Sequence, residues 1–294
     1  MDKREVFSIA KPKAWLINYI EVLKPRETIL LTFIGFCAAV VAGAGHPPVG
    51  WLLLATLAIL VGSGGCNGIT NYIDREVDAK MKRTQHRPLP SKRIYPAVKM
   101  LPWAITLVVI GLIIAWFLDP LCLVFGLLGV IAASTWRKKV TCVFPQGTIA
   151  GCAPVIVGYV AISHHLDLTI LFLCILIGVW IPIHVWSVMI ANREDYIVAG
   201  LTYFPISWKA KDVIKLLLGL SVLLYGSSIA LYYFSDLSLP YLIVANILGI
   251  LMIFATVRLL VTGISHDAWR VYKLTAFPYL GILFLTMALN LWLV

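Results

Sequence analysis

The sequence predicts an all-α integral membrane protein, a bundle of about nine transmembrane helices around a central cavity that opens to the cytoplasmic side. Three observations predict this fold class. Only 13% of the 294 residues are charged and 61% are hydrophobic, whereas a soluble domain carries about 25% charged residues. Apolar stretches recur along the whole chain, and a membrane-spanning helix needs roughly 20 such residues. Lys and Arg gather near every second connection between these stretches, as in multi-pass membrane proteins.

We interpret residues 1–294 as a single domain in which each expected helix is an apolar stretch ended by a polar connection. Residues 1–23 are charged and lack the apolar core of a cleavable signal, so we expect them to stay as a cytoplasmic N-terminal arm. The helices expected after this arm are, in chain order, Glu27–Gly45, Val49–Ile69, Ile94–Leu118, Leu121–Thr135, Gly147–Ser163, Leu168–Ile190, Val213–Phe234, Pro240–Val261 and Tyr272–Val294. The fourth is short for a membrane span, so its flanks would have to complete it.

The connections fall into two kinds by charge. All 24 Lys and Arg residues lie in the N-terminal arm or near every second connection, whereas GAGHPPVG, LDPL, SHHLDL and FSDLSLP contain none. By the positive-inside rule, this pattern predicts a multi-pass protein of the cell (plasma) membrane with its N-terminus in the cytoplasm and its C-terminus outside. Anchoring at the membrane surface explains the net charge of +10. Without a basic soluble module, we expect no nucleic-acid partner.

Two of the basic connections, residues 67–99 and 191–215, also contain acids, which anchoring does not require. In the first, Asn71, Asp74 and Asp78 are spaced i, i+3, i+7 and fall within about 60° of one another on a helix. Such oxygen ligands suit Mg²⁺, which keeps waters and substrate phosphates in its shell. A solvated helix end with salt bridges is the simpler alternative. Because acids at membrane depth are costly and a dense basic stretch follows, we favour a metal site that holds a diphosphate.

The first motif continues into a longer match. The pattern N-x-x-D-x-x-x-D is followed by MKRTQHRPL at residues 81–89. This combination resembles the first signature of the UbiA superfamily of intramembrane prenyltransferases, and is most similar to its protohaem IX farnesyltransferase (haem O synthase) branch. The segments LKPR at 23–26 and RKKVT at 137–141 are weaker matches, and an Asn that the family carries near Val143 is missing. The resemblance covers roughly residues 20–205.

The second motif lies at the end of the sixth expected helix. Trp180 and His184 precede REDY at residues 193–196, at the spacing that the haem branch has between its W-x-x-P-H-F and R-x-D-Y segments. The chain departs from that pattern in having its proline at Pro182. It also lacks the D-x-x-x-D pair that many other UbiA-type enzymes carry here, so the resemblance favours a haem acceptor. On one continuous helix, His184 and Asp195 would share a face.

The resemblance implies transfer of a farnesyl group from farnesyl diphosphate to a vinyl group of haem B, giving haem O, with Mg²⁺ as cofactor. Farnesyl diphosphate, haem B and membrane lipid are the partners it implies. The implied metal ligands are Asn71, Asp74, Asp78 and Asp195, and with Tyr196 they form the expected catalytic set. The cations expected to bind the diphosphate are Lys82, Arg83, Arg87, Lys138 and Arg193. The residues expected to bind haem are His184 and Trp180.

Other interpretations stay open from the residues alone. The same diphosphate site would serve an aromatic or quinone-precursor acceptor. A lone histidine inside a membrane is often only packed and hydrogen-bonded, and Tyr196 equally suits an interfacial anchor. A transporter is a third class, although transport sites usually lie at the bilayer midplane on broken helices, whereas these acids gather near one face. The sequence leaves open the isoprenoid length, the oligomeric state and any protein partner.

Overall fold

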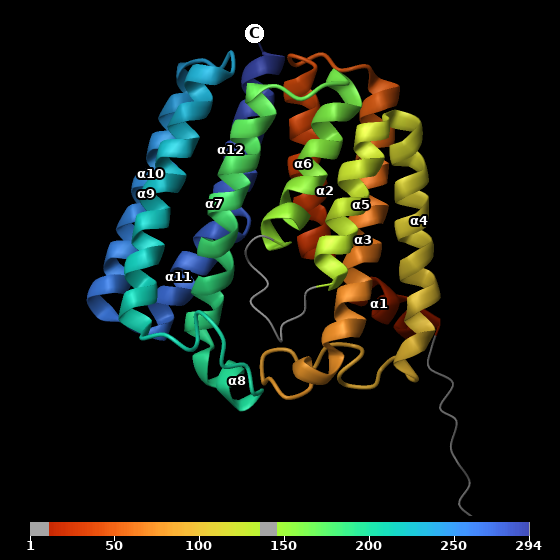
Figure 1. Ribbon diagram of the computed structural model, residues 1–294, viewed down its shortest axis with the longest axis vertical. Helices are drawn as coiled ribbons and strands as arrows, with labels where there is room; N and C mark the ends of the chain where they lie inside the picture. The colour runs from red at the N-terminus through yellow and green to blue at the C-terminus, as the bar shows by residue number, and fades with distance from the viewer. Residues whose placement is uncertain (1–11, 136–145, 294) are drawn as a thin grey trace, which may run out of the picture.

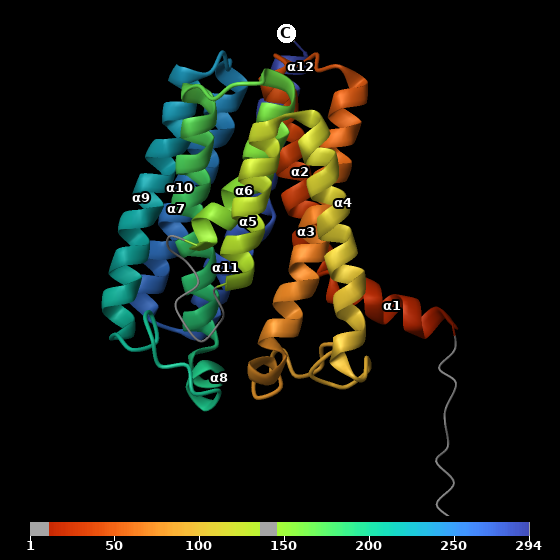
Figure 2. The same ribbon diagram turned by 45° about the vertical axis from the view of Figure 1, so that its right-hand side comes forward.

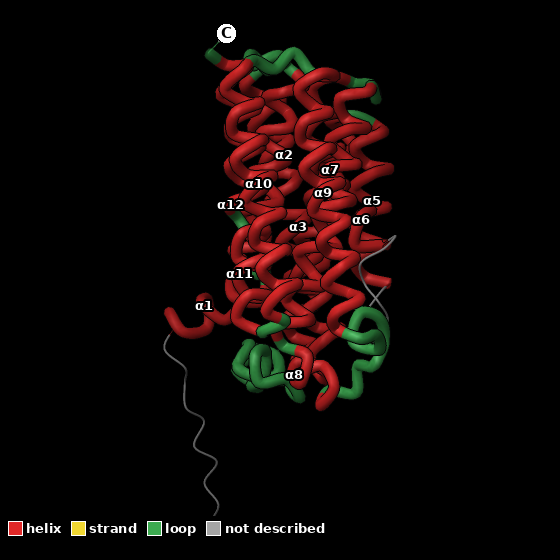
Figure 3. The backbone as a smooth tube through the Cα atoms, turned by 90° about the vertical axis from the view of Figure 1, so that its left-hand side faces the viewer, coloured by secondary structure: helices red, strands yellow, loops and turns green. Residues whose placement is uncertain are grey.

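Helices make up most of the computed structural model, which describes residues 12–135 and 146–293. Those residues contain no strand, and most of the helices run along the long axis of the molecule (Figures 1 and 3). The helices are, in chain order, α1 Pro12–Val22, α2 Pro25–Ala42, α3 Val49–Asp78, the 3₁₀ helix η1 Ala97–Met100, α4 Leu101–Leu118, α5 Pro120–Thr135, α6 Gln146–Ser163, α7 Leu168–Ala191, α8 Arg193–Val198, α9 Ala210–Phe234, α10 Leu239–Thr262, α11 Ser265–Ala276 and α12 Pro278–Trp292. The all-α class is confirmed.

Eight segments in the described part of the chain are long and apolar enough to cross a membrane. Two of them combine neighbouring helices, with η1 and α4 forming Ala97–Leu118 and α11 and α12 forming Ser265–Trp292. α5 is apolar but has only 16 residues, so it is shorter than the others. The chain is therefore a multi-pass membrane bundle. The count of nine spans, and the side of the membrane on which a cavity opens, stay predictions.

Two helix ends differ from the apolar pattern. α3 continues past the expected end at Ile69, because amide and acidic side chains leave the backbone hydrogen-bond ladder intact, and it ends at Asp78. α4 begins at Leu101 rather than at Ile94, and Pro102 occupies its first turn, where a missing N–H costs nothing. The longer α3 carries the whole first acidic motif on one helix, as its spacing predicts.

The second motif is divided between two helices. α7 ends at Ala191, and Asn192 adopts a non-helical conformation before the short helix α8 begins. The Asn192 side-chain amide donates to the carbonyl of Val188 at 2.7 Å, which satisfies one of the carbonyls at the end of α7. The expectation that His184 and Asp195 share the face of one continuous helix is therefore wrong.

The last expected helix is also divided. The apolar pattern predicts one helix over Tyr272–Val294, whereas α11 runs from Ser265 to Ala276 and α12 starts at Pro278. The proline has no N–H to continue the ladder of α11, which explains the break. The apolar pattern misses the first half of α11 because that half contains His266, Asp267 and Arg270.

The two ends of the bundle differ in charge. The connections α3–α4 and α7–α9, which carry Lys and Arg, lie at the end opposite the C-terminus, as does the α10–α11 turn, which has Arg258 before it and Arg270 after it. α1 projects outward beside the bundle near the same end (Figures 1 and 2). The connections α2–α3, α4–α5, α6–α7 and α9–α10 lie at the end of the C-terminus. This segregation agrees with the predicted alternation. Which compartment each end faces stays a prediction.

Helices α2 and α6 form the central seam of the bundle. A Cβ atom added to Gly158 would lie 2.0 Å from the carbonyl oxygen of Gly35, so the two backbones are in direct contact. On one side of this seam, α6 packs against α3, α4 and α5 through small and aliphatic side chains. On the other, α2 and α6 join the large apolar core of α7 and α9–α12, where Tyr279 and Phe284 are fully buried. The polar motifs lie at the basic end of both halves.

Candidate active site

The first acidic motif occupies the last two turns of α3. Asn71 is buried, and its side-chain amide donates to the carbonyl of Val22, the last residue of α1. Asp78 is fully buried, and its Oδ2 accepts from Nη1 of Arg87 at 2.9 Å. Asp74 lies between them on the same face and is partly buried. The three residues therefore lie on one face of α3, as their spacing predicts, at the basic end of the bundle.

The connection after α3 folds back over the end of that helix. The hydroxyl of Thr84 donates to the carbonyl of Asp78 at 3.0 Å, and Met81 is completely buried. This fold directs Arg87 to Asp78, whereas Lys82 stays exposed to solvent. The Nε atom of Arg83 is buried and has no hydrogen-bond partner among the described residues. Because buried polar groups are nearly always paired, this guanidinium is suited to an anion.

The second acidic motif meets the first through a backbone contact. The backbone N–H of Arg83 donates to Oδ2 of Asp195 at 3.1 Å, which joins segments 112 residues apart. Beneath this contact, Met81 packs in one apolar cluster with Met189 and Tyr196. Tyr196 is buried, with 4% of its surface exposed, so an interfacial anchor role does not fit its position.

Not every expected residue joins this cluster. Arg193 donates from Nη1 to the carbonyl of Trp208 at 3.3 Å, so its guanidinium contacts the segment before α9. Lys138 lies outside the described residues. The residues that these contacts bring together are Asp78, Arg83, Arg87, Asp195 and Tyr196, from α3, the α3–α4 connection and α8. Asn71 and Asp74 precede Asp78 on the same face of α3.

The chemistry of these side chains fits a magnesium ion that is shared with a substrate. Within the described residues, no three His, Cys, Asp or Glu side chains gather closely enough to hold an ion by themselves. Mg²⁺ does not require such a cage, since it commonly takes one or two carboxylates and completes its shell with water and phosphate oxygens. Asp74, Asp78 and Asp195 carry hard oxygen atoms of that kind, so they are the residues that could hold such an ion.

His184 lies in a separate aromatic cluster between α7 and α11. Its ring stacks on Trp180 and on Tyr272, with ring centroids 4.7 Å apart in both cases. Its Nδ1 lies 3.1 Å from the hydroxyl oxygen of Thr275, and Nε1 of Trp180 donates to the carbonyl of Thr275 at 2.8 Å. Trp269 continues the aromatic row by an edge contact with Tyr272. The expected pair of His184 and Trp180 is therefore in contact, as part of an aromatic cluster that also contains Tyr272 and Trp269.

Sequence reasoning missed the contribution of α11. Tyr272 and Thr275, one turn apart, contact His184. Tyr272 is the side chain through which α11 stacks on the imidazole, and it also contacts Trp269 of the same helix. The only sequence signal was the polar interruption of the last apolar stretch.

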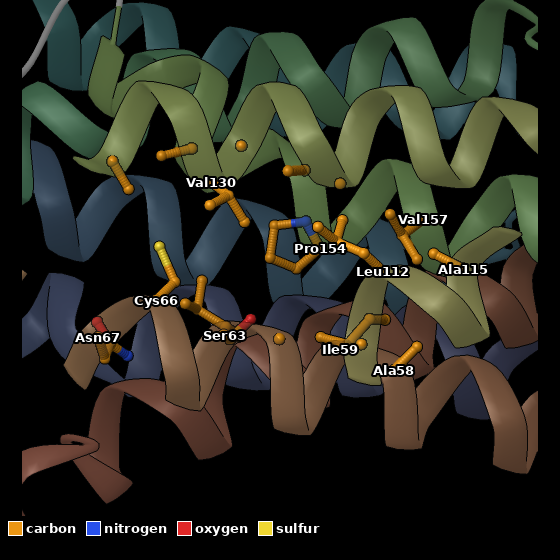
Figure 4. A pocket seen from close by; sticks show the side chains of 18 of the residues that line it. Ala58, Ile59, Ser63, Cys66, Asn67, Leu112, Ala115, Val130, Pro154 and Val157 are labelled. Carbon is orange, nitrogen blue, oxygen red and sulfur yellow. The ribbon is translucent and has the colours of Figure 1, made fainter. Parts of the chain in front are cut away.

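An apolar cavity of about 210 Å³ lies between α3, α4, α5 and α6 (Figure 4). Small residues such as Gly126, Gly129 and Ala153 make room for it. Its polar side chains gather at one end, where Asn67 and Thr70 lie about one turn and one residue, respectively, before Asn71 on α3. The arrangement places an apolar compartment directly next to the candidate metal site.

Comparison with known proteins supports the resemblance over almost the whole length. The sequence profile of the UbiA prenyltransferase family matches residues 29–289. The chain is 34% identical over 281 residues to the protoheme IX farnesyltransferase of Desulforudis audaxviator, a match that covers 94% of this chain and 88% of that protein. It is 32% identical to the protein of the same name from Symbiobacterium thermophilum, with 93% of each chain covered.

Solved structures of low sequence identity share the fold. A structure described as digeranylgeranylglyceryl phosphate synthase superimposes with a TM-score of 0.76 at 20% identity, covering 95% of this chain and 99% of that one. A UbiA homologue from Archaeoglobus fulgidus bound to GPP and Mg²⁺ has a TM-score of 0.66 at 14% identity, covering 94% of this chain and all of the other.

Proposed function

The chain belongs to the UbiA prenyltransferase family, and from that membership we propose that it transfers a farnesyl group from farnesyl diphosphate to a vinyl group of haem B, giving haem O. The observation that carries the proposal is the hydrogen bond between the Arg83 backbone and Asp195. This contact joins two acidic motifs that are far apart in the sequence, and the loop that makes it also carries Arg83 and Arg87. A diphosphate and its divalent metal need this combination of hard oxygen ligands and cations.

The acids and the arginines divide the work on the diphosphate. We assign Asn71, Asp74, Asp78 and Asp195 to the binding of Mg²⁺. When bound, the ion neutralises the charge that develops on the departing diphosphate. Arg83 and Arg87 face the same site and hold phosphate oxygens by charge-assisted hydrogen bonds. Lys82, Lys138 and Arg193 complete the set of cations that we propose for binding the diphosphate.

The isoprenoid chain occupies the apolar cavity of α3–α6. Its polar end beside Asn67 and Thr70 adjoins the diphosphate site, so a linear substrate lies with its head at the acids and its tail between the helices. Burial of the tail contributes about 0.8 kcal/mol per CH₂ group. The glycines and alanines of the wall set the width of the compartment.

The acceptor lies beside His184 and Trp180. The 34% and 32% identity to two protoheme IX farnesyltransferases over nearly the full length supports haem as that acceptor. The aromatic row of α7 and α11 offers flat faces to a tetrapyrrole, and His184 offers a nitrogen ligand for its iron.

The reaction breaks the carbon–oxygen bond of the allylic diphosphate and leaves an allylic cation. The terminal vinyl carbon then forms a bond to this cation, and the positive charge moves to the vinyl carbon next to the porphyrin ring. Water adds there and loses a proton, which gives a hydroxyethylfarnesyl side chain. Tyr196, buried beneath the contact of the two motifs, belongs to the wall of this reaction space. By the distribution of Lys and Arg, the site faces the cytoplasm from the plasma membrane, with the C-terminus outside.

The test is an incubation of the detergent-solubilised protein with haem B, farnesyl diphosphate and Mg²⁺, followed by mass spectrometry. We expect a haem product that has gained a farnesyl group and water, together with one diphosphate per product. EDTA and the Asp74→Ala variant should abolish both. Glu76→Ala is the matched control, because Glu76 lies on the same turn of α3 but is exposed and paired with Arg75.

Two outcomes would contradict the proposal in different ways. Diphosphate release with prenylation of an aromatic acid, and none of haem, would keep the metal site and replace the acceptor. The absence of diphosphate release under all conditions would reject the assignment of the acids and arginines.

A further inference from the structure

The hydroxyl of Thr275 lies at the meeting point of α7 and α11. Thr275 is fully buried on α11, and its Oγ1 lies 2.8 Å from the carbonyl oxygen of Tyr272 and 3.1 Å from that of Val271. The same Oγ1 lies 3.1 Å from Nδ1 of His184. One oxygen therefore has three polar neighbours and a single proton to share with them.

Counting donors determines the direction of these hydrogen bonds. A hydroxyl has one proton and two lone pairs, whereas a backbone carbonyl can only accept. The shortest contact gives the Thr275 proton to the carbonyl of Tyr272, as in other helix threonines that bond back to their own turn. The lone pair left on Oγ1 then faces Nδ1 of His184, and that nitrogen must carry a proton to pair with it. A neutral His184 with a proton on Nδ1 has a free lone pair on Nε2.

The ring of His184 is also held against rotation. Trp180 stacks on one side at an interplanar angle of 13°, and Tyr272 stacks at 30°. Trp180 is itself tied to α11, since its Nε1 donates to the carbonyl of Thr275. With two aromatic rings stacked on the imidazole and Nδ1 occupied, Nε2 is its remaining ring nitrogen.

We infer that Thr275 is a positioning residue of the acceptor site, which fixes His184 as the Nδ1–H tautomer so that Nε2 is presented as the ligand for the iron of a tetrapyrrole. The inference rests on the proposed function, because that function supplies the haem. Iron takes an unprotonated imidazole nitrogen, and the partner of the other nitrogen decides which one is available. α11, which the sequence did not single out, thus becomes the element that prepares the histidine.

The first test needs no haem. ¹⁵N-histidine spectra of the ligand-free protein report the tautomer of each of the six histidines, and the His184→Asn variant assigns the signal of interest. We expect the Nδ1–H form in the wild type and in Thr275→Ser, which keeps the hydroxyl. Thr275→Val should convert the signal to the Nε2–H form or to a mixture. A wild-type His184 protonated on Nε2 would overturn the inference without any measurement on the Thr275 variants.

The second test uses haem titration with absorption and resonance Raman spectra. Loss of a residue that orients a metal ligand typically weakens binding by about 10–100-fold, and we expect such a loss in Thr275→Val with weakening of the iron–histidine vibration. Thr275→Ser should restore both. Thr256→Val is the matched control, because Thr256 is another fully buried helix threonine that bonds back to its own turn, and its side-chain partner is Ser221.

The outcomes separate this inference from the proposed function. If the wild type binds and farnesylates haem, and Thr275→Val does so with unchanged affinity and an unchanged iron–histidine signal, the role of Thr275 is rejected and the function stands. If the wild type does not bind haem, the acceptor assignment is rejected, and the role of Thr275 in presenting an iron ligand is rejected with it.

Discussion

Removal of the Arg87 side chain tests whether the loop after α3 is held by a buried charge. Nη1 of Arg87 lies 2.9 Å from Oδ2 of Asp78, and the exposed fractions of the two side chains are 23% and 1%. Removing one partner of a buried ion pair costs about 3–5 kcal/mol, because the other charge stays desolvated. Since water reaches part of Arg87, we expect Arg87→Ala to lower the free energy of unfolding by about 3 kcal/mol, the low end of that range.

The control is another arginine of the same loop. Arg93 also pairs with a carboxylate, that of Glu21 at 2.7 Å, but the two side chains are 38% and 37% exposed. We expect Arg93→Ala to cost only about 0.2–1 kcal/mol, as exposed pairs do. Reversible unfolding in mixed detergent micelles, followed by the fluorescence of the 10 tryptophans, measures both variants. Equal losses for the two variants would refute the reasoning from burial.

Three further predictions concern packing, the cavity and the second motif. Gly158→Ala should lower the free energy of unfolding by about 1–3 kcal/mol through overpacking, whereas Gly219→Ala should raise it by about 0.5–1 kcal/mol, because its added methyl meets no atom within 4 Å. If thermal unfolding ranked the two variants the other way, the close contact of α2 and α6 at Gly158 would be refuted. Gly126→Leu should fill part of the cavity and so raise the KM for farnesyl diphosphate more than that for the shorter geranyl diphosphate. Equal rises in the two KM values in steady-state assays would mean that the isoprenoid tail binds elsewhere. Asp195→Ala should abolish diphosphate release and lower the free energy of unfolding by about 1 kcal/mol, because one hydrogen bond is lost. The matched variant Glu194→Ala should stay active, since Glu194 is exposed, and an active Asp195→Ala enzyme would exclude Asp195 from the metal site.

The sequence predicted well wherever a feature depends on local chain geometry. Asn71, Asp74 and Asp78 share a face because a helix turns by about 100° per residue, and the structure places them on one helix. The spacing could not show that Asn71 would also tie down α1 or that Asp78 would be paired with Arg87. Those contacts depend on how the following loop folds back.

The second motif shows where local patterns stop being sufficient. A continuous helix would align His184 with Asp195, but the helix is interrupted at Asn192, so the two residues contact different neighbours. His184 packs against α11, and Asp195 reaches the backbone of Arg83. A helix break of one residue changes the direction of everything after it, and hydrophobic periodicity does not report it.

By itself, the sequence determined the membrane class, the alternation of basic and uncharged connections and the residue types of the candidate site, because composition, length and charge act on each segment separately. Only the tertiary structure decided which segments meet. It joined Arg83 to Asp195 and gave His184 its partners Tyr272 and Thr275 on α11. These contacts arise from the packing of helices distant in sequence, and packing depends on the shapes of all the side chains at once.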